Sequence, residues 1–294
     1  MDLFTGSGVA LITPFHQDKS VNYDMLSVLI ERQIEEQTDA IIICGTTGEP
    51  ATLSQEERKN IITFTIEKVN KRIPVIVGTG ANSTECAIQN AKDAKERGAD
   101  GILVVTPYYN KATQNGLYLH YKSVADAVSI PVIIYNVPSR TGCNIKPATI
   151  ARIAETCSNI AGVKEASGDI TQIAELSRLV GDKIAIYSGN DDQIIPVLSL
   201  GGKGVISVLA NVLPRETHNM VCSYLEGDTK RALKLQLQYL PLIRELFTEV
   251  NPIPVKAAMK EIGYDCGGLR LPLTELESEH RETLAVELQK VLVS

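Results

Sequence analysis

Short runs of apolar, β-branched residues recur along this chain, and each run is followed by a stretch with helical periodicity. The runs are too short for helices and too uniformly apolar for strands with one face in water, so they are typical of buried parallel strands. They cover residues 9–12, 40–44, 74–78, 101–105, 131–135, 161–164, 184–188 and 204–208.

The stretches between the runs carry helix start and stop signals. Ser54 and Glu57 form a capping box before a helical pattern that continues to about Asn70. Ser83 opens another helix, which ends at Gly98. Similar patterns cover residues 22–36, 113–128, 147–157 and 171–180.

About eight strand–helix units over about 225 residues predict an α/β fold, a (β/α)8 TIM barrel. A doubly wound sheet is the main alternative, and it normally carries a G-x-G-x-x-G turn after its first strand. Here the first run leads into Thr13-Pro14-Phe15 instead. The nearest glycine-rich candidate, residues 78–83, lacks the third glycine.

The strand signals stop after about Pro214. Helical patterns then cover residues 215–227, 228–249, 252–262 and 274–293. We therefore expect a catalytic barrel over residues 1–225 and a helical C-terminal region over residues 226–294. No Ser/Gly-rich linker divides them, so the helical region is expected to pack on the barrel.

Composition excludes several classes of protein. The 294 residues carry a formal charge of −6 and are 44% hydrophobic, which is ordinary for a globular chain and argues against a nucleic-acid binder. No apolar run reaches the roughly 18–20 residues of a membrane span, and no targeting segment is visible. The cysteines and histidines are scattered without a C-x-x-C or H-E-x-x-H pattern, so we expect no metal site and a reducing cytoplasmic location.

Reactive groups of a TIM barrel lie at the carboxyl ends of its strands. Lys164 ends one apolar run and Tyr135 ends the preceding one. A lysine amine that is partly desolvated becomes a nucleophile able to form a Schiff base with a carbonyl compound, and a phenol beside it can relay protons. The alternatives are a lysine that reaches into water or pairs with Glu165, and a tyrosine at the rim.

Two further segments favour binding of a carboxylate. The turn over residues 45–49, GTTGE, offers hydroxyls and backbone N–H groups, and Arg140 lies in a Pro/Ser/Gly loop. A simple turn and a solvated arginine are the alternatives. Asp191 and Asp192 are interpreted as acidic residues at a helix N-terminus rather than metal ligands. Together these features indicate imine chemistry on a carbonyl compound that carries a carboxylate, without an external cofactor.

The chain resembles the 4-hydroxy-tetrahydrodipicolinate synthase family over essentially its whole length. The motifs that carry the resemblance are GTTGE (45–49), TPYYN (106–110), YNVPSRTG (135–142), GVKEASG (162–168), YSGND (187–191), GGKGVISV (201–208) and NPIPVKAAMKEIG (251–263). The resemblance implies a class I, pyruvate-dependent aldolase of the diaminopimelate route to lysine, acting on pyruvate and L-aspartate 4-semialdehyde.

The resemblance also implies roles for individual residues. Lys164 would form the Schiff base with pyruvate, and Tyr135, Thr46 and Tyr109 would form a proton relay. Tyr109 would reach into the site of a neighbouring subunit, which implies a homo-oligomer, most often a tetramer built as a dimer of dimers, with a dimer as the alternative.

The remaining implied roles concern substrate binding. Thr47 would hold the pyruvate carboxylate, Arg140 would bind the carboxylate of the second substrate, and Gly189 and Ile206 would line the site with main-chain groups.

Two alternative functions stay open at this stage. The first is N-acetylneuraminate lyase or another pyruvate-dependent sugar-acid aldolase, against which Thr46-Thr47 and Arg140 argue. The second is a catalytically inactive barrel kept as a binding or regulatory protein, against which Lys164 and Tyr135 argue.

The sequence differs from part of the family at residues that concern inhibition by lysine. Lysine-inhibited members carry histidines and a glutamate in an allosteric pocket, and the matching positions here hold Gln55, Arg58 and Cys86. We expect weak or absent feedback, because the carboxylate that would face the ammonium group of lysine is missing.

Overall fold

Eight parallel strands close into a barrel in the computed structural model of the chain, which describes residues 3–292. The strands pair in sequence order and β8 pairs with β1, so the predicted (β/α)8 fold is confirmed. The strands are β1 Gly6–Ala10, β2 Ala40–Ile43, β3 Val75–Gly78, β4 Gly101–Val105, β5 Val132–Asn136, β6 Ile160–Glu165, β7 Ala185–Ser188 and β8 Gly204–Ser207.

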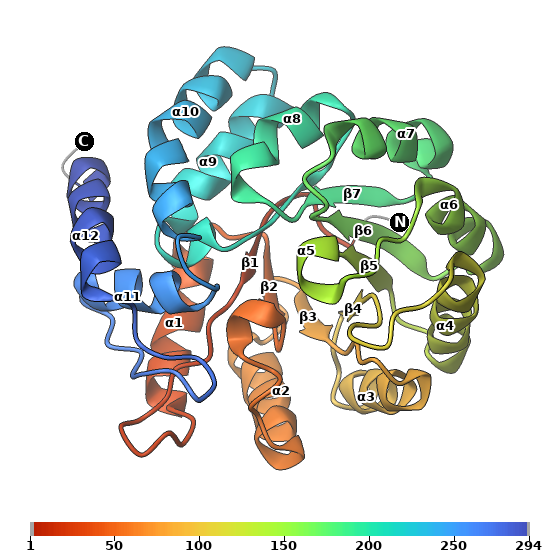
Figure 1. The fold of residues 1–294 in the computed structure, drawn as a ribbon, viewed down its shortest axis with the longest axis horizontal. Coiled ribbons are helices and arrows are strands. Elements are labelled where there is room, and N and C mark those ends of the chain that lie inside the picture. Colours follow the sequence, from red (N-terminus) through yellow and green to blue (C-terminus); the bar gives the residue numbers. More distant parts are fainter. Residues whose placement is uncertain (1–2, 293–294) are drawn as a thin grey trace.

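Helices surround the barrel (Figure 1). They are α1 Tyr23–Glu35, α2 Gln55–Val69, α3 Thr84–Glu96, α4 Gln114–Ala127, α5 Pro138–Thr141, α6 Pro147–Thr156, α7 Ile170–Val180, α8 Ile194–Ser199, α9 Pro214–Leu225, α10 Thr229–Glu245, α11 Ile253–Glu261 and α12 Ser278–Leu292. The capping box predicted at Ser54 is present, with both of its hydrogen bonds to Glu57.

Some element boundaries differ from those predicted. The first strand begins at Gly6 rather than Val9, because Gly6, Ser7 and Gly8 pair with β8 although they lack the apolar side chains that marked the other strands. The helix expected over residues 228–249 ends at Glu245. The last helix begins at Ser278, four positions later than expected, and its predicted last residue, Val293, lies outside the described residues.

Side chains fill the interior of the barrel. Phe4 stacks on Tyr187 with ring centroids 4.3 Å apart, and the Tyr187 hydroxyl donates to the Phe4 carbonyl oxygen at 2.7 Å. Ile42, Ile76 and Ile133 pack in the same interior cluster and are fully buried. A second, larger core lies between the strands and the outer helices. The amino-terminal end of the barrel is therefore closed by packed aromatic rings.

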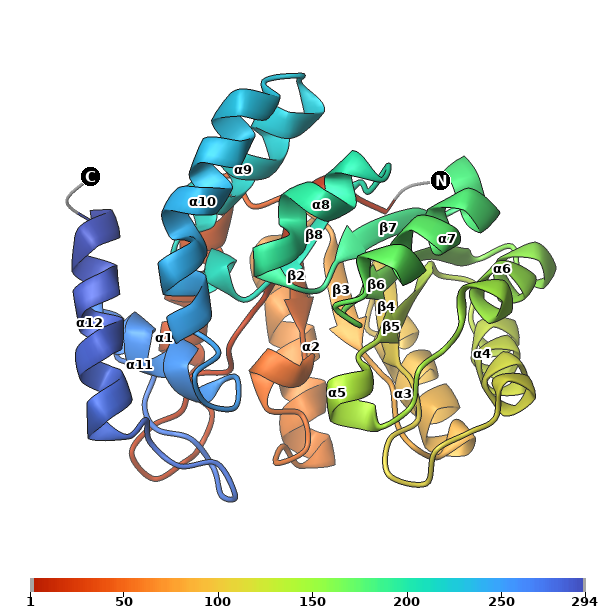
Figure 2. The same ribbon diagram turned by 45° about the horizontal axis from the view of Figure 1, so that its top comes forward.

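Helices α10, α11 and α12 stand together on one side of the barrel, beside α1 and α9 (Figures 1 and 2). The segment between α10 and α12 also contacts the turn that follows β2. Asn251 donates to Thr47 at 3.0 Å, and Lys256 pairs with Glu49 at 2.6 Å. The segment after α10 thus contacts the barrel, while the division at residue 225 stays a prediction.

Candidate active site

Lys164 and Tyr135 lie side by side inside the barrel. They are register partners on β6 and β5, so their side chains point to the same side of the sheet. Both residues are only 6% exposed. The Lys164 amine, Nζ, lies 4.5 Å from the centroid of the Tyr135 ring. The structure thus brings the predicted nucleophile and the predicted proton carrier together at the carboxyl ends of neighbouring strands.

The structure does not support the alternatives considered for Lys164. The residue is buried, so its amine does not reach into bulk water. Glu165 follows it on β6 and points to the opposite face, because side chains alternate along a strand. The Glu165 carboxylate accepts from the Asn136 amide at 3.1 Å and from the Ser167 backbone N–H at 2.8 Å. Burial raises the pKa of Glu165, and these hydrogen bonds oppose the rise.

Asp191 is a buried carboxylate near Lys164, at a position where the sequence predicts a helix N-terminus. It does begin a short 3-10 turn, Asp191–Gln193, but its side chain accepts from the backbone N–H groups of Val208 and Leu209, both at 2.9 Å. Burial raises the pKa of Asp191, and the positive charge of Lys164 is among the influences that lower it. The carboxylate therefore forms part of the electrostatic environment of the candidate nucleophile.

The threonine turn follows β2 directly. Residues Thr46–Gly48 form one 3-10 turn, and Cys44 before it and Glu49 after it adopt positive φ angles of 53° and 55°. Thr46 is half-buried and lines the cavity at the mouth of the barrel. Thr47 is buried, and its hydroxyl oxygen accepts the 3.0 Å hydrogen bond from Asn251.

A buried ion pair holds the threonine turn in place. Glu49 pairs with Lys256 at 2.6 Å, and the two side chains are 0% and 2% exposed. The second oxygen of Glu49 accepts from the Arg270 backbone N–H at 3.2 Å. Burial lowers the pKa of Lys256, and Glu49 opposes that change. The turn is therefore fixed by residues more than 200 positions away in the chain.

Arg140 lies on the short helix α5, above the mouth of the barrel. Its guanidinium donates to the Asn251 backbone carbonyl at 3.2 Å and lines the same cavity as Thr46 and Tyr135. Asn251 thus contacts both Thr47 and Arg140, the two residues expected to bind carboxylates. Its sequence position gave no sign of this role, because it lies in the C-terminal region, 111 residues from Arg140.

The cavity has a volume of about 460 Å³. Thr46, Tyr135 and Arg140 line it, as do Gln55 and Arg58, two of the positions expected in the lysine pocket. The Arg58 guanidinium donates to the Gly78 carbonyl oxygen. The third of those positions, Cys86, is exposed on α3.

Five of the predicted residues are not among those that line the cavity: the buried Thr47 and four others. Ile206 is fully buried in the interior cluster that contains Tyr135. Gly189 donates from its backbone to the Glu165 carbonyl at 2.7 Å, and a Cβ there would lie 2.6 Å from Ala166. Lys164 lies against Tyr135, while Tyr109 is 91% exposed with a φ of 72°. A single chain therefore does not bring Tyr109 to Tyr135.

Two groups of side chains among residues 3–292 have a composition that could hold a metal ion. They are Asp39, His218 and Cys222, and Glu249, Glu277 and His280. None of these residues lines the cavity.

The chain is similar to known proteins over its full length. Residues 3–291 match the dihydrodipicolinate synthetase family. A 4-hydroxy-tetrahydrodipicolinate synthase of Lachnoclostridium phytofermentans is 56% identical over 291 residues, 99% of each chain. One from Clostridium tetani is 55% identical over 98% of each chain.

Solved structures agree with this assignment. A dihydrodipicolinate synthase from Aquifex aeolicus superposes with a TM-score of 0.96 at 46% identity, over 98% of each chain. The chloride-inhibited enzyme from Acinetobacter baumannii, complexed with pyruvate, gives 0.96 at 45% identity, over 99% of each chain. On these matches and on the barrel described above, the chain belongs to the dihydrodipicolinate synthetase family.

Proposed function

We propose that this chain is a 4-hydroxy-tetrahydrodipicolinate synthase, which condenses pyruvate with L-aspartate 4-semialdehyde. The observation that carries the proposal is the buried Lys164 amine, 4.5 Å from the Tyr135 ring at the mouth of a barrel. The cavity of about 460 Å³ lies within the size range of small-molecule sites. The relatives that match the whole chain carry this activity in their names.

The reaction begins with an imine. The Lys164 amine attacks the carbonyl carbon of pyruvate and a water molecule leaves, so the bond from nitrogen to carbon replaces the bond from oxygen to carbon. Tyr135 passes protons to and from the departing oxygen, and Thr46 and a neighbouring subunit's Tyr109 complete the relay. No external cofactor takes part, because the protonated imine itself withdraws electrons from the methyl carbon.

Carbon–carbon bond formation follows. Loss of a methyl proton converts the imine to an enamine, whose carbon attacks the aldehyde carbon of the second substrate, and the aldehyde oxygen takes up a proton. The amino group of that substrate then attacks the imine carbon and displaces Lys164, which closes the ring. Every atom of the product comes from the two substrates, less one water molecule.

The two carboxylates are bound at different places. Thr47 and the backbone N–H groups of its turn hold the pyruvate carboxylate, and Gly189 and Ile206 shape the pyruvate end with main-chain groups. Arg140 binds the carboxylate of the second substrate, because a guanidinium can donate two parallel hydrogen bonds. The bond from Arg140 to the Asn251 carbonyl keeps the guanidinium over the cavity.

Oligomer formation belongs to the same proposal. Tyr109 is 91% exposed, so its part in the relay requires a second copy of the chain, and a tetramer built as a dimer of dimers supplies one. One solved relative, 41% identical with a TM-score of 0.97, is described as a monomeric variant, so analytical ultracentrifugation is the direct check. None of the helices in residues 3–292 has the length and apolarity needed to cross a membrane. The cytoplasmic location belongs to the proposal and rests on the biosynthetic activity proposed for the chain.

A coupled assay tests the function. The protein is mixed with pyruvate, aspartate semialdehyde, the downstream reductase and NADPH, and the absorbance of NADPH is followed. Pyruvate-dependent oxidation of NADPH is expected. Its absence, together with cleavage of a 2-keto-3-deoxy sugar acid or of N-acetylneuraminate, would assign the chain to the sugar-acid aldolases and would mean that Arg140 binds another group.

Lysine inhibition is expected to be weak or absent. Arg58 lines the cavity as a fixed cation, and Gln55 and Cys86 provide no carboxylate for the ammonium group of lysine. Initial rates measured with lysine up to the low millimolar range are expected to stay within experimental scatter. A large fall in rate over that range would contradict this expectation, whereas the coupled assay would still support the activity.

A further inference from the structure

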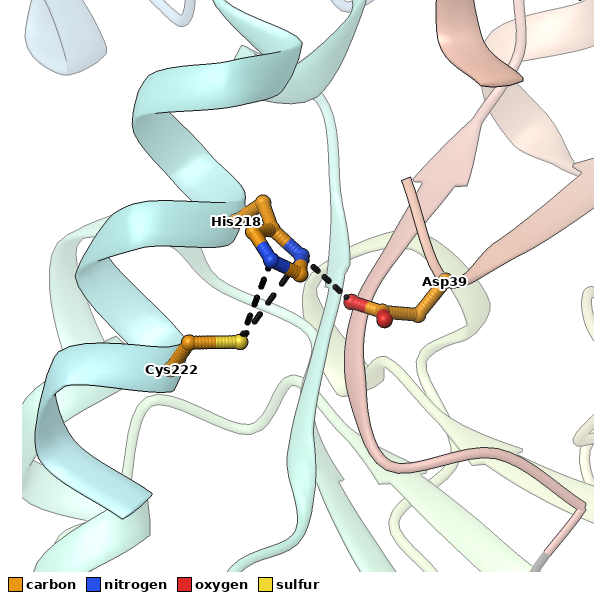
Figure 3. Close-up of side chains that lie close together, drawn as sticks. All are labelled: Asp39, His218 and Cys222. Carbon is orange, nitrogen blue, oxygen red and sulfur yellow. Dashed lines mark hydrogen bonds and ion pairs between the residues drawn. The ribbon is translucent and has the colours of Figure 1, made fainter. Parts of the chain in front are cut away.

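Three metal-ligating side chains meet at the amino-terminal end of the barrel (Figure 3). Asp39 lies directly before β2, while His218 and Cys222 lie one turn apart on α9. The His218 Nδ1 atom is 3.0 Å from the Asp39 Oδ2 atom, and the Cys222 Sγ atom is 3.7 Å from Nδ1 and 3.4 Å from Nε2. All three residues are half-buried, so the cluster can be reached from solvent.

Contacts outside the cluster hold the Asp39 carboxylate in place. Its Oδ2 atom accepts from the Ser7 backbone N–H at 2.7 Å, and the Asp39 backbone N–H donates to the Ser7 carbonyl at 2.8 Å. The carboxylate also occupies the position that a Cβ at residue 6 would take, and that residue is glycine with a φ of 118°. The carboxylate is therefore fixed against the edge of β1.

The helix that carries the other two ligands is also anchored near Asp39. Arg215, three residues before His218, pairs with Glu36 at 2.6 Å and donates to the Glu35 carbonyl at 2.8 Å. These residues lie at the end of α1, just before Asp39 in the chain. The three side chains thus come from α9 and from the residue directly before β2, and independent bonds set the relative positions of these two segments.

We propose that Asp39, His218 and Cys222 bind a divalent transition-metal ion of the zinc class, with a fourth position open to water. Metal–ligand bonds of about 2.0–2.3 Å place ligand atoms around a tetrahedral ion roughly 3.2–3.7 Å apart. The separations of 3.0 and 3.7 Å from Nδ1 are close to this range, and all three ligand atoms lie within 4.8 Å of one another.

The chemistry of the donor set selects the ion. A thiolate and an imidazole favour zinc, cobalt and copper over magnesium and calcium, which prefer oxygen ligands. The carboxylate and the thiolate together carry two negative charges, which balance a divalent ion.

A proton competes with the metal at this cluster. The hydrogen bond to Asp39, followed by that to Cys222, raises the pKa of His218 to about 10, and these two are the titratable groups that act on it. Metal binding therefore requires loss of a proton from the imidazole, as is usual for a histidine ligand.

This site is separate from the candidate active site. Asp39 precedes β2, whereas the threonine turn follows it, so the strand of four residues, roughly 13 Å at 3.3 Å per residue, lies between them. A bound ion would join α9 to the edge of the barrel and would leave the Lys164 environment unchanged.

Cobalt titration of the full-length protein tests the proposal. The protein is freed of metal with a chelator, kept reduced, and titrated with Co²⁺ alone. We expect saturation at one equivalent, with a thiolate-to-cobalt charge-transfer band in the near ultraviolet that Zn²⁺ abolishes by displacement. Cys222→Ser should remove the band, and His218→Gln should weaken binding at least about tenfold. The matched control, Cys86→Ser on α3, should keep both the band and the affinity.

Several results would overturn the proposal. They are a wild-type protein without saturable cobalt binding, a band that persists in Cys222→Ser, and a band lost in Cys86→Ser. Circular dichroism and turnover of pyruvate check that each variant is folded. If Cys222→Ser does not fold, Asp39→Asn and His218→Gln decide the matter, because unchanged cobalt affinity in both would exclude the site.

Discussion

Polar side chains have different surroundings at the two ends of the barrel. At the carboxyl end, Thr46, Tyr135 and Arg140 surround a cavity of about 460 Å³, and the buried Lys164 amine lies against Tyr135. At the amino end, the stacked rings of Phe4 and Tyr187 close the interior. The polar groups there, including Asp39, are bonded to one another and to the backbone.

The reactive groups therefore lie at the carboxyl end, and the polar groups at the amino end stabilise the fold. A strand can present a side chain beyond its carboxyl end without disturbing its own pairing, and the following loop is free to vary. Charged groups that find partners within the protein contribute to the fold instead. Variants of the groups that line the cavity should therefore change turnover. Variants of the paired charges that support the threonine turn should change stability, and variants at the amino end should leave turnover unchanged.

The largest expected effect is that of Lys164→Ala. Without the amine no imine can form, so turnover in the coupled assay should fall to background while the melting temperature stays close to that of the wild type. The matched control is Lys183→Ala, which removes an exposed lysine just before β7, at the amino end. Retained turnover in Lys164→Ala would refute the Schiff-base role.

The next effect concerns the support of the threonine turn. Lys256→Met leaves the Glu49 carboxylate buried without its cation, which typically costs about 3–5 kcal/mol. Urea unfolding should show this loss. The double variant Glu49→Gln/Lys256→Met should recover a large part of it, since no unpaired charge is then buried. A single variant as stable as the wild type would show that the pair is not needed for folding.

A smaller effect is expected at the rim of the cavity. Hydrogen bonds to charged groups contribute about 1.5–3 kcal/mol, so Arg140→Ala should lower kcat/KM for aspartate semialdehyde by about 10- to 150-fold. The KM for pyruvate should change little. Arg152→Ala, which removes a guanidinium stacked on Tyr118 away from the cavity, is the control. Equal effects on both substrates would show that Arg140 does not discriminate between them.

The smallest effect tests the amino end. An alanine Cβ at residue 6 would overlap the Asp39 carboxylate, so Gly6→Ala should destabilise the protein by about 1–3 kcal/mol. Turnover should be unchanged. Gly227→Ala is matched in backbone conformation, because its φ is 95°, but it has no atom within 4 Å of the added Cβ. Reduced turnover in Gly6→Ala would show that the amino end of the barrel also affects catalysis at the carboxyl end.

The sequence could predict those features that depend on residues near one another in the chain. Apolar runs marked the strands, and reading the residue at the end of each run found Lys164 and Tyr135. The start of β1 was missed because Gly6 and Ser7 pair in the sheet without apolar side chains.

Features that depend on distant residues were out of reach. Asn251 contacts Thr47 from 204 positions away, and His218 contacts Asp39 from 179 positions away. Neither pairing leaves a local pattern. Asp191 begins a short 3-10 turn, as its position suggests, but its hydrogen bonds from Val208 and Leu209 depend on how the chain returns to β8.

Trapping of the imine shows directly whether Lys164 forms a Schiff base with pyruvate. The protein is incubated with pyruvate and sodium borohydride, digested, and examined by mass spectrometry. We predict a reduced pyruvate adduct on the peptide that contains Lys164, and none when pyruvate is left out. An adduct on a different lysine, or no adduct in a protein that still turns over both substrates, would refute the Schiff-base role of Lys164.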